Sequence, residues 1–328
     1  MRAGCVPVMI NTKLPADQVR YIAKDADVKM VFCEEKLRTL CDAQTRCVSF
    51  EEHGEAGYRE FVDPGPFLSF SPNSKDIAEQ PYTSGSTGRP KGVLLHHVGQ
   101  RWMIRRLIES RDITAGDCGI IAAPLYHKNA LLAIKSALGA GGRVVLLAKF
   151  DVREYIRCIG EYGLTMLTGV PTMYALLLQQ EEFLKQTDLS SVRALSMGSA
   201  PASEVLLDNL QLVFPRARIN LNYGITEGGP VLLSWKHADG LEKPRATVGY
   251  PLPDVEIRLV DGPHENEGIL GGILQRRTNA HVDGLQIYIH GNSRETKFGR
   301  CRYRILANDH VLETELQDKH PAAYKRTI

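Results

Sequence analysis

Hydrophobic positions near the start of the chain alternate between two spacings. Apolar runs of strand length occupy residues 4–10 and 28–33, and residues 14–25 between them place Leu14, Val19 and Ile22 at helical spacing. A strand, a helix and a second strand at this spacing predict a βαβ unit and hence a parallel sheet. A chain that begins directly at a buried strand leads us to expect that a preceding segment is missing.

A longer alternating series follows residue 92. The pattern predicts a helix over residues 93–110 and then strands and helices in regular alternation. The expected strands are 120–123, 143–147, 165–168, 194–197 and 218–222, and the expected helices are 130–138, 152–162, 172–180 and 203–213. This alternation is typical of an α/β fold with layered parallel sheets and helices on both faces.

The pattern changes beyond residue 250. Residues 255–260 alternate apolar and polar side chains with a period of two, which predicts the start of a small antiparallel sheet, whereas later residues show no clean period. We therefore expect an N-terminally truncated α/β core over 1–250, the start of a small β subdomain over 251–271, and a divergent tail over 272–328. We expect this tail to be disordered or translated in a shifted frame. The second hypothesis comes from the codons of residues 279–286, which permit Met-Pro-Met-Leu-Met-Gly-Tyr-Lys when they are read one nucleotide later.

Composition narrows the class of protein without naming a function. The chain has 328 residues, 43% of them hydrophobic, and a formal net charge of +2, which disfavours an electrostatic nucleic-acid binder. Its seven cysteines are odd in number and include no C-x-x-C pair, so we expect reduced thiols in the cytoplasm. No apolar run reaches the about 18 residues of a membrane span.

The stretch from Thr83 to Lys91 is the most informative part of the sequence. Glycines at 85 and 88 permit close backbone approach, and the hydroxyl side chains between them offer hydrogen-bond donors. Successive backbone N–H groups in such a loop form an anion-binding nest, to which Lys91 adds a positive charge. The loop does not fit the G-x-x-x-x-G-K-[ST] phosphate-binding pattern. The alternative interpretation is a flexible Gly/Ser linker.

This loop resembles the signature loop of the adenylate-forming superfamily, which includes acyl-CoA synthetases, luciferases and the adenylation domains of peptide synthetases. The resemblance implies the large α/β domain of that family and a loop that handles the β- and γ-phosphates of ATP. The implied phosphate-binding residues are Thr83, Ser84, Gly85, Ser86, Thr87 and Gly88, with Lys91 as a catalytic residue.

A second match lies at residues 222–227, Asn-Tyr-Gly-Ile-Thr-Glu. By resemblance, Asn222, Tyr223 and Gly224 bind the nucleotide with the Tyr223 ring near the adenine, Thr226 approaches the α-phosphate, and Glu227 holds Mg²⁺. A carboxylate at the end of a strand suits a hard cation whose shell is completed by phosphate. The alternative is that Thr226 and its acidic neighbour only cap a helix.

Three shorter matches complete the resemblance. Gly198, Ser199, Ala200 and Pro201 are implied to line the adenine pocket with backbone, although this sequence also suits an ordinary turn. The resemblance places Tyr126 and His127 beside the acyl pocket and Gly169 and Val170 in its wall; the alternative for His127 is a structural role.

The resemblance implies that a carboxylic acid, fatty or aryl, is activated by ATP and Mg²⁺ as acyl-AMP and then joined to CoA. The small-molecule acid, ATP and CoA are thus the expected partners. Residues 124–128 contain no acidic side chain to bind an amino group, and Lys128 would repel one, which disfavours an amino-acid adenylation module. The family's C-terminal lid and ribose-binding Asp are not identified in the tail, so a catalytically impaired remnant is the other alternative.

Overall fold

The computed structural model describes most of the chain as two compact units. The described residues are 2–42, 44–51, 57–83, 89–224, 226, 228, 231–234, 240, 243, 246–252, 255–256, 272–276, 285–291, 300–307 and 310–317. The units are Met1–Arg101 and Trp102–Ile328. The division after Arg101 does not test the domain boundary expected at residue 250, which stays a prediction.

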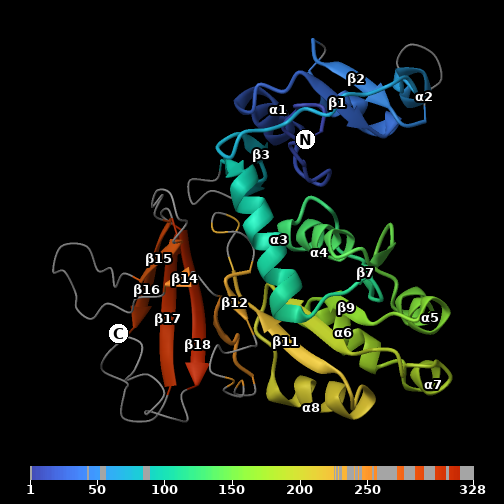
Figure 1. Ribbon diagram of the computed structural model, residues 1–328, viewed down its shortest axis with the longest axis vertical. Coiled ribbons are helices and arrows are strands. Elements are labelled where there is room, and N and C mark those ends of the chain that lie inside the picture. Colours follow the sequence, from blue (N-terminus) through green and yellow to red (C-terminus); the bar gives the residue numbers. More distant parts are fainter. Residues whose placement is uncertain are drawn as a thin grey trace. The chain divides into compact units, whose positions relative to one another are not determined.

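The first unit contains a two-stranded parallel sheet (Figure 1). The amphipathic helix α1 (Ala16–Asp25) buries Val19 and Ile22, which confirms the helical spacing. The strand β1 (Met30–Cys33) pairs with β2 (Arg46–Ser49), and the short helix η1 (Glu35–Leu40) connects them. The one-turn helix α2 (Tyr58–Phe61) follows.

The prediction of a buried strand over residues 4–10 is wrong. Gly4 has a φ of 75°, Cys5 is exposed and Val6 keeps 40% of its surface. Pro7 has no N–H, and its carbonyl accepts a single bond from Gln80 N at 3.1 Å. The expected βαβ unit over 4–33 is therefore also wrong, and the parallel pairing forms between β1 and β2 instead.

Two short antiparallel pairs complete the first unit. The strand β3 (Ile77–Glu79) pairs with β6 (Leu95–His96), and β4 (Tyr82–Thr83) pairs with β5 (Lys91–Gly92). The predicted helix over 93–110 therefore begins later, as α3 (His97–Arg111).

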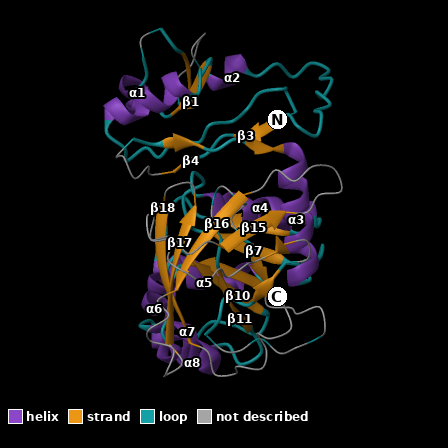
Figure 2. Cartoon of the chain, turned by 90° about the vertical axis from the view of Figure 1, so that its left-hand side faces the viewer, coloured by secondary structure: helices purple, strands orange, loops and turns teal. Residues whose placement is uncertain are grey.

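The second unit is built on a five-stranded parallel sheet with the order β8-β7-β9-β10-β11 (Figures 1 and 2). The alternating series predicted from the sequence is confirmed, and the fold class is α/β with helices flanking a parallel sheet. Only the five-residue helix α7 is new. The strands are β7 (Cys118–Ile121), β8 (Arg143–Leu146), β9 (Met166–Gly169), β10 (Ala194–Gly198) and β11 (Arg218–Asn222), and the helices are α4 (Lys128–Gly139), α5 (Val152–Tyr162), α6 (Pro171–Leu178), α7 (Glu181–Lys185) and α8 (Glu204–Val213).

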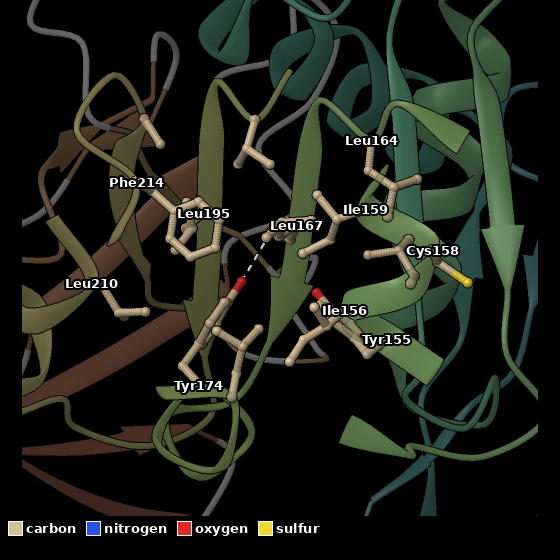
Figure 3. Close-up of a cluster of buried hydrophobic side chains, with 14 of the residues drawn as sticks. Tyr155, Ile156, Cys158, Ile159, Leu164, Leu167, Tyr174, Leu195, Leu210 and Phe214 are labelled. Carbon is tan, nitrogen blue, oxygen red and sulfur yellow. Dashed lines mark hydrogen bonds between the residues drawn. The ribbon is translucent and has the colours of Figure 1, made fainter. Parts of the chain in front are cut away.

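The main core lies between one face of this sheet and the helices α5, α6, α7 and α8. Alternate strand residues such as Ile120, Leu167 and Leu195 point into it and are fully buried. Figure 3 shows Tyr174 of α6 reaching into this layer, where its hydroxyl donates to the Leu167 carbonyl at 3.0 Å. The period of two along the strands and the helical spacing of the covering elements together explain the burial.

The helices α3 and α4 form a second apolar layer. Met103 and Leu107 of α3 join Leu132 of α4 in a buried cluster that also contains Val231 and Leu252. Because α4 contacts β7 and β8 but shares no residue with the main core, it covers the other face of the sheet. This doubly wound arrangement is the one that the alternating pattern predicts.

The remaining strands are antiparallel. The strand β12 (Leu233–Ser234) pairs with β13 (Tyr250–Pro251). A further sheet has the order β14-β15-β16-β17-β18, which confirms the antiparallel element expected to start at residue 255. Its strands are β14 (Val255–Glu256), β15 (Gly272–Arg276), β16 (Leu285–Gly291), β17 (Arg300–Ala307) and β18 (His310–Gln317).

Candidate functional site

The carboxyl edge of the parallel sheet gathers most of the residues predicted to form a site. The chain runs from β7 outward to β8 and then returns to β9 on the other side of β7, so the strand order reverses between β7 and β9. Ligands of such sheets bind beyond the carboxyl ends of the strands at this reversal. The loops that leave the edge carry Tyr126 and His127 after β7 and Val170 after β9. They also carry Ser199–Pro201 after β10, and Tyr223, Gly224 and Thr226 after β11.

The β10 and β11 ends lie side by side at this edge. Gly198 is the register partner of Asn222, and a Cβ at Gly198 would stand 3.2 Å from the Asn222 carbonyl oxygen, which explains the glycine. The next residue, Ser199, has a φ of 67°, an uncommon value for a residue with a side chain. Its exposed hydroxyl accepts from the Asn129 amide of α4 at 3.3 Å. Two of the predicted segments are therefore in contact, and Ser199–Pro201 are exposed residues.

Asn222 uses its whole side-chain amide to fix this edge. Its Nδ2 donates to Ser196 Oγ at 2.6 Å and to the Met197 carbonyl at 3.2 Å, and its Oδ1 accepts from Arg111 Nη2 at 2.8 Å. Arg111 is the last residue of α3, and burial lowers the pKa of its guanidinium to about 10. The contact ties α3 to the residue immediately before Tyr223.

Tyr223, Gly224 and Thr226 continue from Asn222 and are each half-buried. The Tyr223 carbonyl accepts from Leu232 N at 3.0 Å, so a hydrogen bond from a later part of the chain holds the start of the segment after β11. Glu227 lies outside the described residues. Within the described part of the chain, no cluster of three or more His, Cys, Asp or Glu side chains could hold a metal ion. The role of Glu227 in binding Mg²⁺ therefore stays a prediction.

The β7 end supplies the predicted acyl-pocket residues. The Tyr126 and His127 rings are in contact, with centroids 4.5 Å apart and planes tilted by 50°. Although His127 is largely exposed, desolvation of its ring lowers its pKa. The next residue, Lys128, turns inward with 6% of its surface exposed, and burial, assisted by Lys135, lowers its pKa to about 6. This burial weakens the charge repulsion invoked against amino-acid substrates, and the lack of an acidic residue is the argument that remains.

The β9 end is shaped by close packing. A Cβ at Gly169 would come within 3.2 Å of the Tyr174 ring, so a larger residue there would require that ring to shift by a few tenths of an ångström. The neighbouring Thr168 carbonyl accepts from the Tyr155 hydroxyl at 2.9 Å, and Thr168 Oγ1 donates to the Ile120 carbonyl at 2.5 Å. These bonds fix the position of the strand end from which Val170 leaves.

The predicted phosphate loop belongs to the first unit and is closed by a β-hairpin. Thr83 and Lys91 are register partners in β4 and β5, and residues 84–88 between them, Ser84 to Gly88, lie outside the described residues. Tyr82 anchors the hairpin by donating from its hydroxyl to Asp25 at 2.5 Å. Lys91 is exposed, whereas Thr83 Oγ1 is buried and makes no hydrogen bond to any described residue.

These residues fit the predicted nucleotide in two respects. A buried hydroxyl without a partner is costly unless a ligand or water supplies one, and Thr83 offers such a group beside an exposed lysine. Tyr223, which is half-buried, and the exposed residues Ser199–Pro201 can contact a purine and its sugar. The structure thus brings the predicted residues together as two sets, one at the sheet edge and one in the hairpin.

The opposite, amino edge of the sheet holds a polar network that the sequence pattern does not reveal. Arg193 donates to both Asp117 oxygens, at 2.6 Å from Nε and 2.7 Å from Nη2. Asp117 also accepts from Thr165 Oγ1 at 2.7 Å and from Thr114 N at 2.8 Å. Burial alone would raise the pKa of the Asp117 carboxyl, but these hydrogen bonds hold it well below its usual range. Because its members precede β7, β9 and β10, the network aligns the strands whose other ends form the site.

Two residues at the site were not predicted from the sequence, Arg111 and Asn129. Both lie on helices, α3 and α4, that precede the strands they contact by tens of residues. The polar face of each helix looks like a solvated face in the sequence, so no local signal marks them. Among the described residues, no helix is both long and apolar enough to cross a bilayer.

Comparison with known proteins agrees with this assembly. A family model described as AMP-binding enzyme matches residues 1–277. The 4-coumarate–CoA ligase 1 of Petroselinum crispum is 32% identical over 269 residues, covering 79% of this chain and 47% of the relative. The 4-coumarate–CoA ligase 4 of Arabidopsis thaliana is 31% identical over 267 residues, covering 79% and 46%. The chain thus spans about half the length of the curated relatives it matches.

Solved structures share the fold. A long-chain-fatty-acid–CoA ligase (FadD1) from Archaeoglobus fulgidus superposes with a TM-score of 0.72 at 20% identity, over 95% of this chain and 67% of that one. The anthranilate–CoA ligase AuaEII, solved with anthranoyl-AMP, gives a TM-score of 0.73 at 20% identity, over 96% and 62%. At these identities the likeness concerns the fold.

Proposed function

The chain belongs to the AMP-binding enzyme family, as an adenylate-forming, acyl-CoA-synthetase-like protein, and on that premise we propose that it activates a carboxylic acid. The acid attacks the α-phosphorus of ATP to give acyl-AMP and pyrophosphate, and the thiol of CoA then displaces AMP to give the thioester. The family and its CoA-ligase relatives support both steps in general. Aryl acids are the first substrate class to test, because the curated relatives are 4-coumarate–CoA ligases.

The observation that carries the proposal is the convergence of predicted segments at the carboxyl edge of the parallel sheet. The ends of β7, β9, β10 and β11 deliver a tilted Tyr126–His127 ring pair, a glycine at 169, the exposed loop after Gly198 and the Tyr223 segment to one edge. A structural explanation for any one of these is available, but a common edge at the strand-order reversal is where a ligand is expected.

Each set of residues has a distinct task in the proposed reaction. The Tyr223 ring and the Ser199–Pro201 backbone hold the adenosine, and Thr226 lies next to the α-phosphate. Lys91 and the Thr83 hydroxyl take the outer phosphates, and Glu227 binds Mg²⁺, whose charge offsets the repulsion between the acid and the phosphates. Tyr126, His127, Gly169 and Val170 enclose the acid.

The experiment is carboxylate-dependent ATP–pyrophosphate exchange on the purified chain. Aryl, fatty and amino acids are compared, with Lys91→Ala as the site variant and Lys149→Ala, another exposed lysine, as the matched control. Loss of one well-placed charge-stabilising group lowers the rate about 10²–10³-fold, so Lys91→Ala should nearly abolish exchange and Lys149→Ala should not.

The outcomes separate the alternatives. Exchange with aryl acids supports the proposal, whereas exchange with fatty acids alone corrects the substrate class. Exchange that requires an amino acid would identify an amino-acid adenylation module. A folded protein that binds ATP without exchange in any acid would be the impaired remnant, and the proposed activity would then be wrong.

A further inference from the structure

Arg111 is a half-buried cation whose presence the packing of α3 does not explain. Its guanidinium is partly desolvated, and among the described residues its side chain makes one hydrogen bond, to the neutral Asn222 amide at 2.8 Å. Placing a charge in such surroundings is costly, and an apolar residue of similar length would pack without that cost. The retention of the charge therefore requires another reason.

Other hydrogen bonds fix both partners of the contact between Arg111 and Asn222. The Arg111 carbonyl accepts from Arg193 Nη1 at 3.2 Å, and Arg193 is itself clamped by both oxygens of Asp117. The Arg111 side chain then reaches Asn222, whose Nδ2 is bonded to Ser196 and Met197 of β10. A continuous chain of hydrogen bonds thus runs from the amino edge of the sheet to its carboxyl edge.

Asn222 is the position where this chain of bonds meets the site. It stands directly before Tyr223 in the sequence and opposite Gly198 in the register, so it adjoins both segments expected to contact the adenosine. The amide has an acceptor that only Arg111 satisfies among the described residues, and its two donors are used on β10. Rotation of this side chain would break three hydrogen bonds at once and alter the path by which the backbone enters Tyr223 and Gly224.

We propose that Arg111 is a positioning residue for the nucleotide, which acts by locking the Asn222 amide and thereby fixing the backbone of Tyr223 and Gly224 before the ligand arrives. The identity of the ligand in this inference rests on the proposed function, whereas the contact between Arg111 and Asn222 does not depend on it. A segment that is already ordered loses less conformational entropy when the nucleotide binds, so preorganisation of this kind raises the affinity for the nucleotide.

The test compares three variants. Arg111→Met keeps the aliphatic stem and removes the charge and the hydrogen bond, and Arg111→Lys keeps a charge and one donor. Arg218→Met is the matched control, because Arg218 is an exposed arginine at the other end of the same strand, β11. Two quantities are measured: amide hydrogen exchange of residues 219–226 without ligand, and the dissociation constant of AMP by calorimetry.

The inference predicts faster exchange at Tyr223 and Gly224 in Arg111→Met, with wild-type exchange in Arg218→Met. The AMP dissociation constant should rise about tenfold in Arg111→Met, the size of losing one hydrogen bond from a charged group, and Arg111→Lys should recover much of it. Faster exchange with unchanged AMP affinity would reduce the contact to a structural one and overturn the inference, as would unchanged exchange. If the wild-type protein binds no AMP, the proposed function fails, and exchange alone decides whether Arg111 locks the segment.

Discussion

The Asp117–Arg193 pair offers a quantitative test of how the sheet is held in place. Asp117 keeps 5% of its side chain exposed and Arg193 keeps 35%, so the carboxylate is the buried member. Substituting Arg193→Met removes both hydrogen bonds to the carboxylate and two more to the Arg111 and Asp112 carbonyls, at 3.2 and 2.9 Å. Among the described residues, Asp117 then keeps its bonds from Thr114 and Thr165.

Removing one partner of a buried pair costs about 3–5 kcal/mol, and the partial exposure of Arg193 and the remaining threonine bonds favour the lower end. A loss of about 3 kcal/mol corresponds to a fall of about 6–12 °C in melting temperature for a unit of this size. Thermal unfolding followed by circular dichroism measures it. Arg157→Met, which removes exposed ion pairs with Glu154 and Glu161 on α5, is the control and should change the melting temperature little.

The pH dependence provides an independent check of the same pair. Because the pKa of Asp117 is lowered in the folded protein, its contribution to stability is present above the unfolded value of about 4 and is lost as pH falls below that value. The wild-type protein should therefore lose more stability than Arg193→Met between pH 5 and pH 2. Equal acid slopes, or a melting temperature in Arg193→Met close to that of the control, would refute the reasoning.

Three smaller predictions follow from single contacts. Replacing Asp151, whose side chain accepts from Glu154 N at 2.9 Å as the N-cap of α5, by Ala should cost about 1 kcal/mol in denaturant unfolding. Tyr174→Phe should cost about 1–3 kcal/mol by the same assay, because its hydroxyl lies 3.0 and 3.1 Å from two buried carbonyls; an unchanged midpoint would mean that water replaces it. Gly198→Val should weaken AMP binding, measured by calorimetry, more than it lowers stability, because its side chain would press on the Asn222 carbonyl at the site.

The sequence predicts the second unit well because its elements follow strong periodic patterns. The strands at 118–121 and 194–198 are short, largely apolar runs, and the strand at 218–222 alternates polar and apolar residues. Local spacing is enough to identify all three. The strand expected over residues 4–10 fails for a specific reason: an apolar run says nothing of pairing, and Pro7 and the positive φ of Gly4 prevent a regular ladder. The pairing of β1 with β2 depends on contacts that no local pattern encodes.

The candidate site, too, could be predicted from the sequence only in part. Segments with an unusual local composition, such as the loops after Gly198 and Asn222, are visible in the sequence and meet at one edge because parallel strands end together. The residues that support them are not visible. Arg111, Asn129 and Arg193 are ordinary polar residues in their own elements, and only the tertiary structure shows which strand end or carboxylate each one holds.

The central claim, that the carboxyl edge of the sheet receives adenylate, is tested most directly by photoaffinity labelling with 8-azido-ATP followed by peptide mass spectrometry. The account predicts label on peptides that contain Ser199–Pro201 or Tyr223–Thr226, and loss of that label when unmodified ATP is in excess. Label confined to other peptides, or label at these peptides that excess ATP does not displace, would contradict it.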